Sequence, residues 1–143
     1  MMNTVRLTRV VTFSAAHRYF RPDWSADRNR AVFGPCANEH GHGHNYECSV
    51  TVSGPLDAET GMVINLQEFD RILREEIRDR FDHRFINHDV PEFGPGGKIP
   101  TGEQLAVFLW ERIDSRLPAA VVLERVRVRE DSSLYADYEG PRP

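Results

Sequence analysis

The stretch from Gly34 to Tyr46, GPCANEHGHGHNY, places one cysteine, one glutamate and three histidines close together. Neutral imidazole is a preferred ligand of zinc, and a thiolate or carboxylate beside such an ion can act as a base. His42 and His44 are two residues apart, so in an extended segment their imidazoles project from the same face and can chelate one ion. Gly41 and Gly43 let the backbone approach a ligand closely. The stretch therefore predicts a metal site.

A catalytic zinc ion usually has three protein ligands and keeps one position open. The predicted third ligand is His17, which ends a strand-like segment on the parity of the apolar residues before it. A neighbouring antiparallel strand can bring it beside the histidine pair. From the residues alone, that pair is either His40 with His42 or His42 with His44.

Two strand-like segments must position these histidines. Apolar residues occupy alternate positions in residues 5–17, and a similar alternation marks residues 44–54. We expect Cys48 to lie on the side of its strand opposite to His42 and His44, as a small buried apolar residue. A purely structural zinc site, which usually relies on several thiolates, is therefore disfavoured.

Two helices are expected next, because capping pairs precede apolar residues at helical spacing. Asn65 with Glu68 predicts a helix that runs to about Phe81, and Thr101 with Gln104 predicts a second that ends before Pro118. Residues 123–131 and 134–138 are again strand-like. The order ββααββ is typical of an α+β domain with an antiparallel four-stranded sheet and both helices on one face. Exposed sheet edges favour a homo-oligomer.

Composition limits the class of protein. At 143 residues we expect a single domain over residues 1–143. The net charge of −4 gives no field that attracts nucleic acid, and the apolar runs are too short to cross a membrane. The segment MMNTVRLTRV lacks the apolar core of a signal peptide, so Cys36 and Cys48 are expected to be thiols in the cytoplasm.

Five segments carry a resemblance to a known family. VTFSAAH, FGPCANEHGHGHNY, TGMVINLQEFD, FDHRFIN and PTGEQLA together resemble the 6-pyruvoyl tetrahydropterin synthase and 6-carboxytetrahydropterin synthase family of zinc-dependent lyases, over nearly the whole chain. The resemblance implies that His17, His42 and His44 are the zinc ligands. It also implies the T-fold, or tunnelling fold, in which subunits form a barrel with active sites between them. The expected assembly is a hexamer built from two trimers.

The resemblance further implies roles for individual residues. Cys36 matches the family's catalytic cysteine, Asp82 and His83 match its Asp–His pair, and Glu130 matches its pterin-anchoring glutamate. Without the resemblance, Asp82 and His83 would be interpreted as the end of a helix, where the dipole favours a histidinium.

The implied binding segment lies at the start of the second helix. Thr101 and Glu103 match it, at a place where free backbone N–H groups are available. The implied reaction is elimination of triphosphate from 7,8-dihydroneopterin triphosphate. Its product is either 6-carboxytetrahydropterin, a queuosine precursor, or 6-pyruvoyl tetrahydropterin, a tetrahydrobiopterin precursor.

Two features bear on the product. Cys36 lies six residues before His42, the spacing of the tetrahydrobiopterin enzymes, whereas queuosine-pathway members commonly have four. Glu39 stands in the Glu-x-x-His-Gly-His motif of a folate-associated branch. It is therefore predicted as an alternative base that directs side-chain cleavage to 6-hydroxymethyl-7,8-dihydropterin.

Two other classes of protein share the histidine pattern. A three-histidine zinc hydrolase would attack its substrate with metal-bound water and would not need Cys36. A non-catalytic zinc- or pterin-binding module would need neither Cys36 nor His83.

Overall fold

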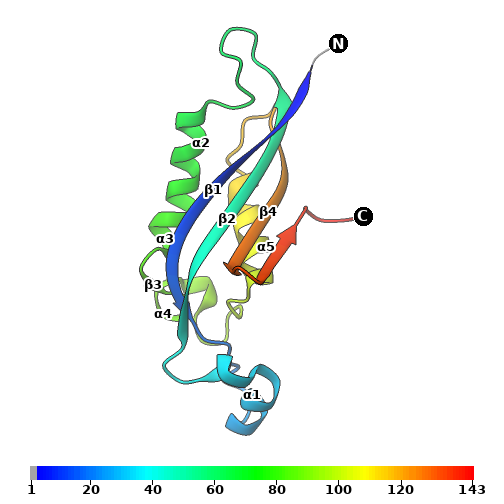
Figure 1. The fold of residues 1–143 in the computed structure, drawn as a ribbon. Coiled ribbons are helices and arrows are strands. Elements are labelled where there is room, and N and C mark those ends of the chain that lie inside the picture. Colours follow the sequence, from blue (N-terminus) through cyan, green and yellow to red (C-terminus); the bar gives the residue numbers. More distant parts are fainter. Residues whose placement is uncertain (1–2) are drawn as a thin grey trace.

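The computed structural model describes residues 3–143, and its centre is a twisted sheet with helices packed on one face (Figure 1). The long strands are β1 (Thr4–His17), β2 (His42–Pro55), β4 (Val122–Asp131) and β5 (Leu134–Tyr138). A two-residue strand, β3 (Arg84–Phe85), extends the sheet, whose order is β3-β1-β2-β4-β5. All neighbours are antiparallel except β1 and β3. The predicted α+β fold is confirmed. The strand β3 was not predicted, because two residues are too few to show a strand periodicity.

The pairing of β1 with β2 runs without a bulge from Thr4↔Pro55 to His17↔His42. Because side chains alternate along a strand, His42, His44 and Cys48 all project from one face. The expectation that Cys48 faces away from the two histidines is therefore wrong, since an even number of residues separates all three. Cys48 is buried in the core as predicted, four residues beyond His44.

The predicted helices cover this same face. The first comprises α2 (Leu66–Leu73), a π-helical turn η2 (Arg74–Arg78) and α3 (Asp79–Phe81), and the second is α5 (Gly102–Asp114). Both predicted caps form, because the Asn65 side chain accepts from the backbone N–H of Glu68 and Thr101 accepts from Gln104. The helices bury large apolar side chains against the sheet: Phe69, Leu73, Ile77, Phe81, Leu105, Leu109 and Ile113.

The segment between β1 and β2 contains two elements that the sequence did not predict. They are α1 (Ala26–Phe33) and a 3₁₀ turn, η1 (Gly34–Ala37), and α1 projects from the end of the sheet (Figure 1). Ser25 caps α1, and the only buried residue of this helix is Asn29. A helix without an apolar stripe gives no helical periodicity, so its sequence resembles a loop.

The connection from β3 to α5 contains α4 (Ile86–Asp89) and a 3₁₀ turn, η3 (Pro91–Phe93).

Across residues 3–143, every helix is too short or too polar to span a lipid bilayer.

Candidate metal centre and its surroundings

Three histidines meet where β1 ends and β2 begins. His17 Nε2 lies 3.1 Å from His42 Nε2, and the nearest ring nitrogens of His17, His42 and His44 all lie within 4.8 Å of one another. Two imidazole nitrogens on one tetrahedral zinc ion, each 2.0–2.1 Å from it, are roughly 3.3 Å apart. The Nε2 atom of His44 is buried and has no hydrogen-bond partner within residues 3–143. A donor set with these spacings and an orphaned buried nitrogen fits a metal ion.

The surroundings favour the neutral form of His17 and His42, which is the form that binds metals. Burial, followed by the charges of His42 and His44, lowers the pKa of His17 to about 3, against a weaker opposing effect of the Pro100 backbone carbonyl. Burial and His44 also lower the pKa of His42, while the charge of Glu130 acts in the other direction.

Gly41 allows the turn into β2 to lie against the end of β1. Its φ is +68°, and a Cβ atom there would lie 2.7 Å from the carbonyl oxygen of His17 and 2.8 Å from the ring of Phe85. Any side chain would therefore push His17 and His42 apart. The glycine beside the histidine is required by geometry, as the sequence pattern indicates.

Glu130, near the end of β4, lies beside the histidine cluster and is only 6 % exposed. Its Oε1 accepts a hydrogen bond from the Tyr19 hydroxyl at 3.1 Å, and its Oε2 lies 3.8 Å from His44 Nε2. A Cβ atom added to Gly102 would lie 3.6 Å from Oε1, so the carboxylate faces the first residue of α5. The predicted binding residues Glu130 and Thr101 therefore come together at this helix N-terminus.

Glu103 follows on the first turn of α5 with an exposed side chain. Its charge is among the causes that raise the pKa of Tyr19, after burial, Glu130 and Cys36, so Glu103 lies within electrostatic reach of Tyr19. The N-terminal turn of α5 and the end of β4 together form one side of the site.

Cys36 lies in η1, on the segment that crosses from β1 to β2. Its carbonyl oxygen accepts a hydrogen bond of 2.8 Å from the backbone N–H of Tyr19, which ties the turn to the residues after His17. Burial, followed by the negative charge of Glu130, raises the pKa of the Cys36 thiol. These two effects disfavour the thiolate of Cys36.

Asp82 and His83 form a pair at the edge of the sheet. Asp82 Oδ2 lies 3.1 Å from His83 Nδ1, and Asp82 Oδ1 accepts the backbone N–H of Ser14 at 2.9 Å. The Ser14 N–H and the interactions with His83 and Arg78 lower the pKa of Asp82 against the effect of desolvation. His83 has a φ of 60°, a backbone conformation uncommon outside glycine and one that is concentrated at functional sites.

One chain does not bring His83 and Cys36 together. The His83 side chain is 84 % exposed and borders surface hollows with Ser14 and Asn45, which belong to the sheet face opposite the core. Cys36 instead lies beside Tyr19 and Glu130, on the side of the histidine cluster.

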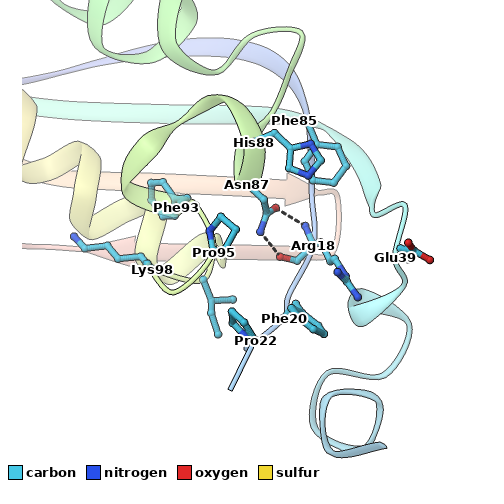
Figure 2. A pocket seen from close by; sticks show the side chains of 13 residues that line it. Arg18, Phe20, Pro22, Glu39, Phe85, Asn87, His88, Phe93, Pro95 and Lys98 are labelled. Carbon is cyan, nitrogen blue, oxygen red and sulfur yellow. Dashed lines mark hydrogen bonds between the residues drawn. The ribbon is translucent and has the colours of Figure 1, made fainter. Parts of the chain in front are cut away.

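Glu39 and His40 lie outside the histidine cluster, and both are exposed. Glu39 borders a cavity of about 170 Å³ together with Arg18 and Phe20 (Figure 2), and neither Cys36 nor the three clustered histidines line that cavity. The Asn87 side chain fixes Arg18 by accepting its backbone N–H and donating to its carbonyl, each at 2.8 Å.

Two tyrosines at the site were not predicted. Tyr19 contacts Glu130 through its hydroxyl and Cys36 through its backbone, and Tyr46 Oη lies 2.7 Å from His17 Nδ1. Tyr46 could have been found from its parity with His42 and His44. Tyr19 lies beyond the strand, where parity gives no signal.

The chain is similar to known proteins over nearly its whole length. A family model described as 6-pyruvoyl tetrahydropterin synthase matches residues 6–141. A 6-pyruvoyl tetrahydrobiopterin synthase of Drosophila melanogaster is 42% identical over 137 residues, which is 96% of this chain and 80% of the relative. The Homo sapiens protein of that name is 38% identical over 135 residues, or 94% of this chain and 91% of the relative.

Solved structures agree with the sequence comparisons. The 6-pyruvoyl tetrahydropterin synthase of Caenorhabditis elegans superposes with a TM-score of 0.89 at 34% identity, covering 98% of each chain. A Plasmodium vivax structure of the same name, at 19% identity and a TM-score of 0.64, shares the fold over 95% of this chain and 97% of its own.

Proposed function

Because this chain belongs to the 6-pyruvoyl tetrahydropterin synthase family, we propose that it is a zinc-dependent lyase that converts 7,8-dihydroneopterin triphosphate to 6-pyruvoyl tetrahydropterin and triphosphate. The observation that carries the proposal is the convergence of His17, His42 and His44 beside a buried carboxylate, Glu130. This arrangement offers a metal and an anchor for a flat heterocycle in one place.

Glu130 binds the pterin in this proposal. A carboxylate accepts two parallel hydrogen bonds from the amino and ring N–H groups of the pterin, which fixes the orientation of the ring. The Tyr19 hydroxyl already donates to Oε1 and holds the carboxylate in place. Thr101 and Glu103 contribute the start of α5, where backbone N–H groups have no partner within the helix.

The metal is held by His17, His42 and His44. When zinc is bound, it supplies Lewis-acid polarisation that acidifies a side-chain hydroxyl and the adjacent C–H of the substrate. The Cys36 thiol, whose pKa Glu130 helps to raise, would be easier to deprotonate beside a bound cation.

Cys36 Sγ takes the proton from the substrate side chain, and His83, oriented by Asp82, moves protons as general acid and base. The overall conversion is redox-neutral and needs no external oxidant or reductant. Triphosphate leaves with one proton, the two side-chain carbinols become ketones, and the ring gains the two hydrogens that make it a tetrahydropterin.

The site is completed between subunits in this proposal, since His83 and Cys36 do not meet within one chain. The outer edge of β1 pairs with β3 only at Ala15 and Ala16, and β5 forms the other edge of the sheet. Such edges favour pairing with further copies of the chain. We propose the T-fold barrel and a hexamer of two trimers, with zinc as the cofactor of each site.

The expected compartment is the cytoplasm, because both Cys36 and Cys48 are free thiols.

Product analysis tests the proposal. Protein loaded with zinc is incubated with 7,8-dihydroneopterin triphosphate, and the pterin is identified by mass spectrometry. We expect 6-pyruvoyl tetrahydropterin, as the spacing of Cys36 and the names of the relatives favour. Formation of 6-carboxytetrahydropterin would show that the chain catalyses the queuosine-type reaction. Absence of turnover in zinc-loaded protein would favour a non-catalytic binding module.

Glu39 provides the second arm of this experiment. If it acts as an alternative base, wild-type protein forms some 6-hydroxymethyl-7,8-dihydropterin, and Glu39→Ala abolishes that product. Because Glu39 borders a cavity separate from the histidines, we expect the product of Glu39→Ala to match that of wild type. A changed ratio would establish Glu39 as a base.

A further inference from the structure

Tyr46 is completely buried on the core face of β2, directly behind the histidine cluster. Its ring stacks on Phe13 with centroids 4.7 Å apart and planes only 5° from parallel. Its hydroxyl oxygen lies 2.7 Å from Nδ1 of His17, whose side chain is also fully buried. Because both rings are buried and closely packed, neither Tyr46 Oη nor His17 Nδ1 can easily move away from the other.

A neutral imidazole carries one proton, and only the nitrogen without the proton can bind a metal. In His17 the nitrogen that faces the other ligands is Nε2, 3.1 Å from His42 Nε2. Metal binding through Nε2 requires the proton to reside on Nδ1, where the Tyr46 oxygen can accept a hydrogen bond from Nδ1–H. Metal-binding histidines generally need such a partner for their second ring nitrogen.

We propose that Tyr46 is a positioning residue for the metal centre: its hydroxyl oxygen accepts a hydrogen bond from Nδ1–H of His17 and thereby holds Nε2 unprotonated and directed at the ion. Tyr46 would position His17 whichever reaction the site performs, so zinc affinity tests this role separately from product formation.

The burial of the pair determines how large the effect should be. Water cannot reach this position to replace the Tyr46 hydroxyl. Removing the hydroxyl therefore leaves Nδ1–H of His17 without its closest hydrogen-bond acceptor. The backbone carbonyl of Pro100 is a second acceptor for the His17 ring and limits the loss. Removing such a partner of a metal ligand typically weakens binding 10–100-fold, and we expect the lower end, about 10-fold.

The test compares the zinc affinity of metal-free wild type and Tyr46→Phe by competition with a chromophoric chelator. The Phe ring keeps the stacking on Phe13, and the melting temperature checks that the variant is folded. Tyr138→Phe is the control, because that tyrosine packs on Trp110 at the far edge of the sheet. We expect about 10-fold weaker binding for Tyr46→Phe and wild-type binding for Tyr138→Phe.

The tautomer of His17 provides a readout that a purely structural role would not change. Nitrogen-15 NMR of metal-free wild-type protein should show a protonated Nδ1 and a bare Nε2 in His17, and Tyr46→Phe should shift this population toward Nε2–H. A wild-type His17 with the proton on Nε2 would overturn the proposal even if the variant failed to fold. Unchanged zinc affinity in a folded Tyr46→Phe protein would also overturn it.

Discussion

Glu130 Oε2 lies 3.8 Å from His44 Nε2, so the buried carboxylate and the candidate metal ligand face the same small volume. His44 Nε2 has no hydrogen-bond partner within residues 3–143, and Glu130 uses Oε1 to accept the Tyr19 hydroxyl. A substrate ring held by Glu130 would therefore present its side chain to a metal held by the histidines. This relationship connects ring recognition with metal chemistry in the proposed reaction.

The choice between histidine pairs leads to a metal-content prediction. His42→Ala should lose bound zinc, because His42 Nε2 is one of the three clustered nitrogens. His40→Ala is the matched control and should retain one zinc ion per chain, since His40 is exposed and outside the cluster. Elemental analysis of the dialysed proteins measures both. Zinc loss in His40→Ala with retention in His42→Ala would show that the proposed ligand pair, His42 with His44, is wrong.

Base and metal are separate parts of the proposed machinery, so they should be separable by mutation. Cys36→Ala should keep its zinc and its melting temperature, because the side chain is a partly exposed member of a 3₁₀ turn. Its turnover should fall on the order of 10²–10⁴-fold, the usual contribution of a positioned base. Wild-type turnover by a folded, zinc-loaded Cys36→Ala protein is incompatible with the proposed role.

The raised pKa of Cys36 predicts how its reactivity depends on pH. Only the thiolate is alkylated, so in metal-free protein the iodoacetamide rate should be below that of an ordinary thiol at pH 7 and should rise with pH. Glu130→Gln removes the negative charge that contributes to the shift, which lowers the pKa and speeds alkylation at pH 7.

Cys48 serves as the internal control for this experiment. Burial raises its pKa to about 12, so it should remain unmodified throughout. If Glu130→Gln slowed alkylation of Cys36, the electrostatic coupling inferred here would have the wrong sign.

Completion of the site between subunits predicts complementation. Cys36→Ala and His83→Ala should each be inactive alone, but oligomers reassembled from an equal mixture contain some interfaces with both native residues. With random mixing about a quarter of the interfaces are intact, and activity should recover toward that fraction. Mixed oligomers are verified by mass spectrometry. Failure of verified mixtures to regain turnover would place both residues in one chain's site.

Much of the fold could be predicted because the patterns are local. The caps at Asn65 and Thr101 begin the two long helices as expected, and strand periodicity locates β1 and β2. The helix α1 could not be predicted, because its single buried residue, Asn29, is held by hydrogen bonds to neighbouring backbone instead of by an apolar face.

The histidine cluster was predictable in part, whereas its surroundings were not. Strand parity left His40 with His42 and His42 with His44 as alternatives, and only the family resemblance favoured the second pair. His17 was predicted from its place at the end of its strand, where it lies opposite His42. Tyr19 meets Glu130 only because the chain after β1 crosses the end of β4, a contact between residues far apart in sequence. Pairing between such distant residues leaves no local pattern in a single sequence.

The most direct test of the central claim is triphosphate release by wild-type protein before and after removal of its metal. Protein stripped with a chelator should stop converting 7,8-dihydroneopterin triphosphate, and one equivalent of zinc per chain should restore both turnover and the 6-pyruvoyl tetrahydropterin product. Full turnover by protein shown to contain no metal would contradict the account.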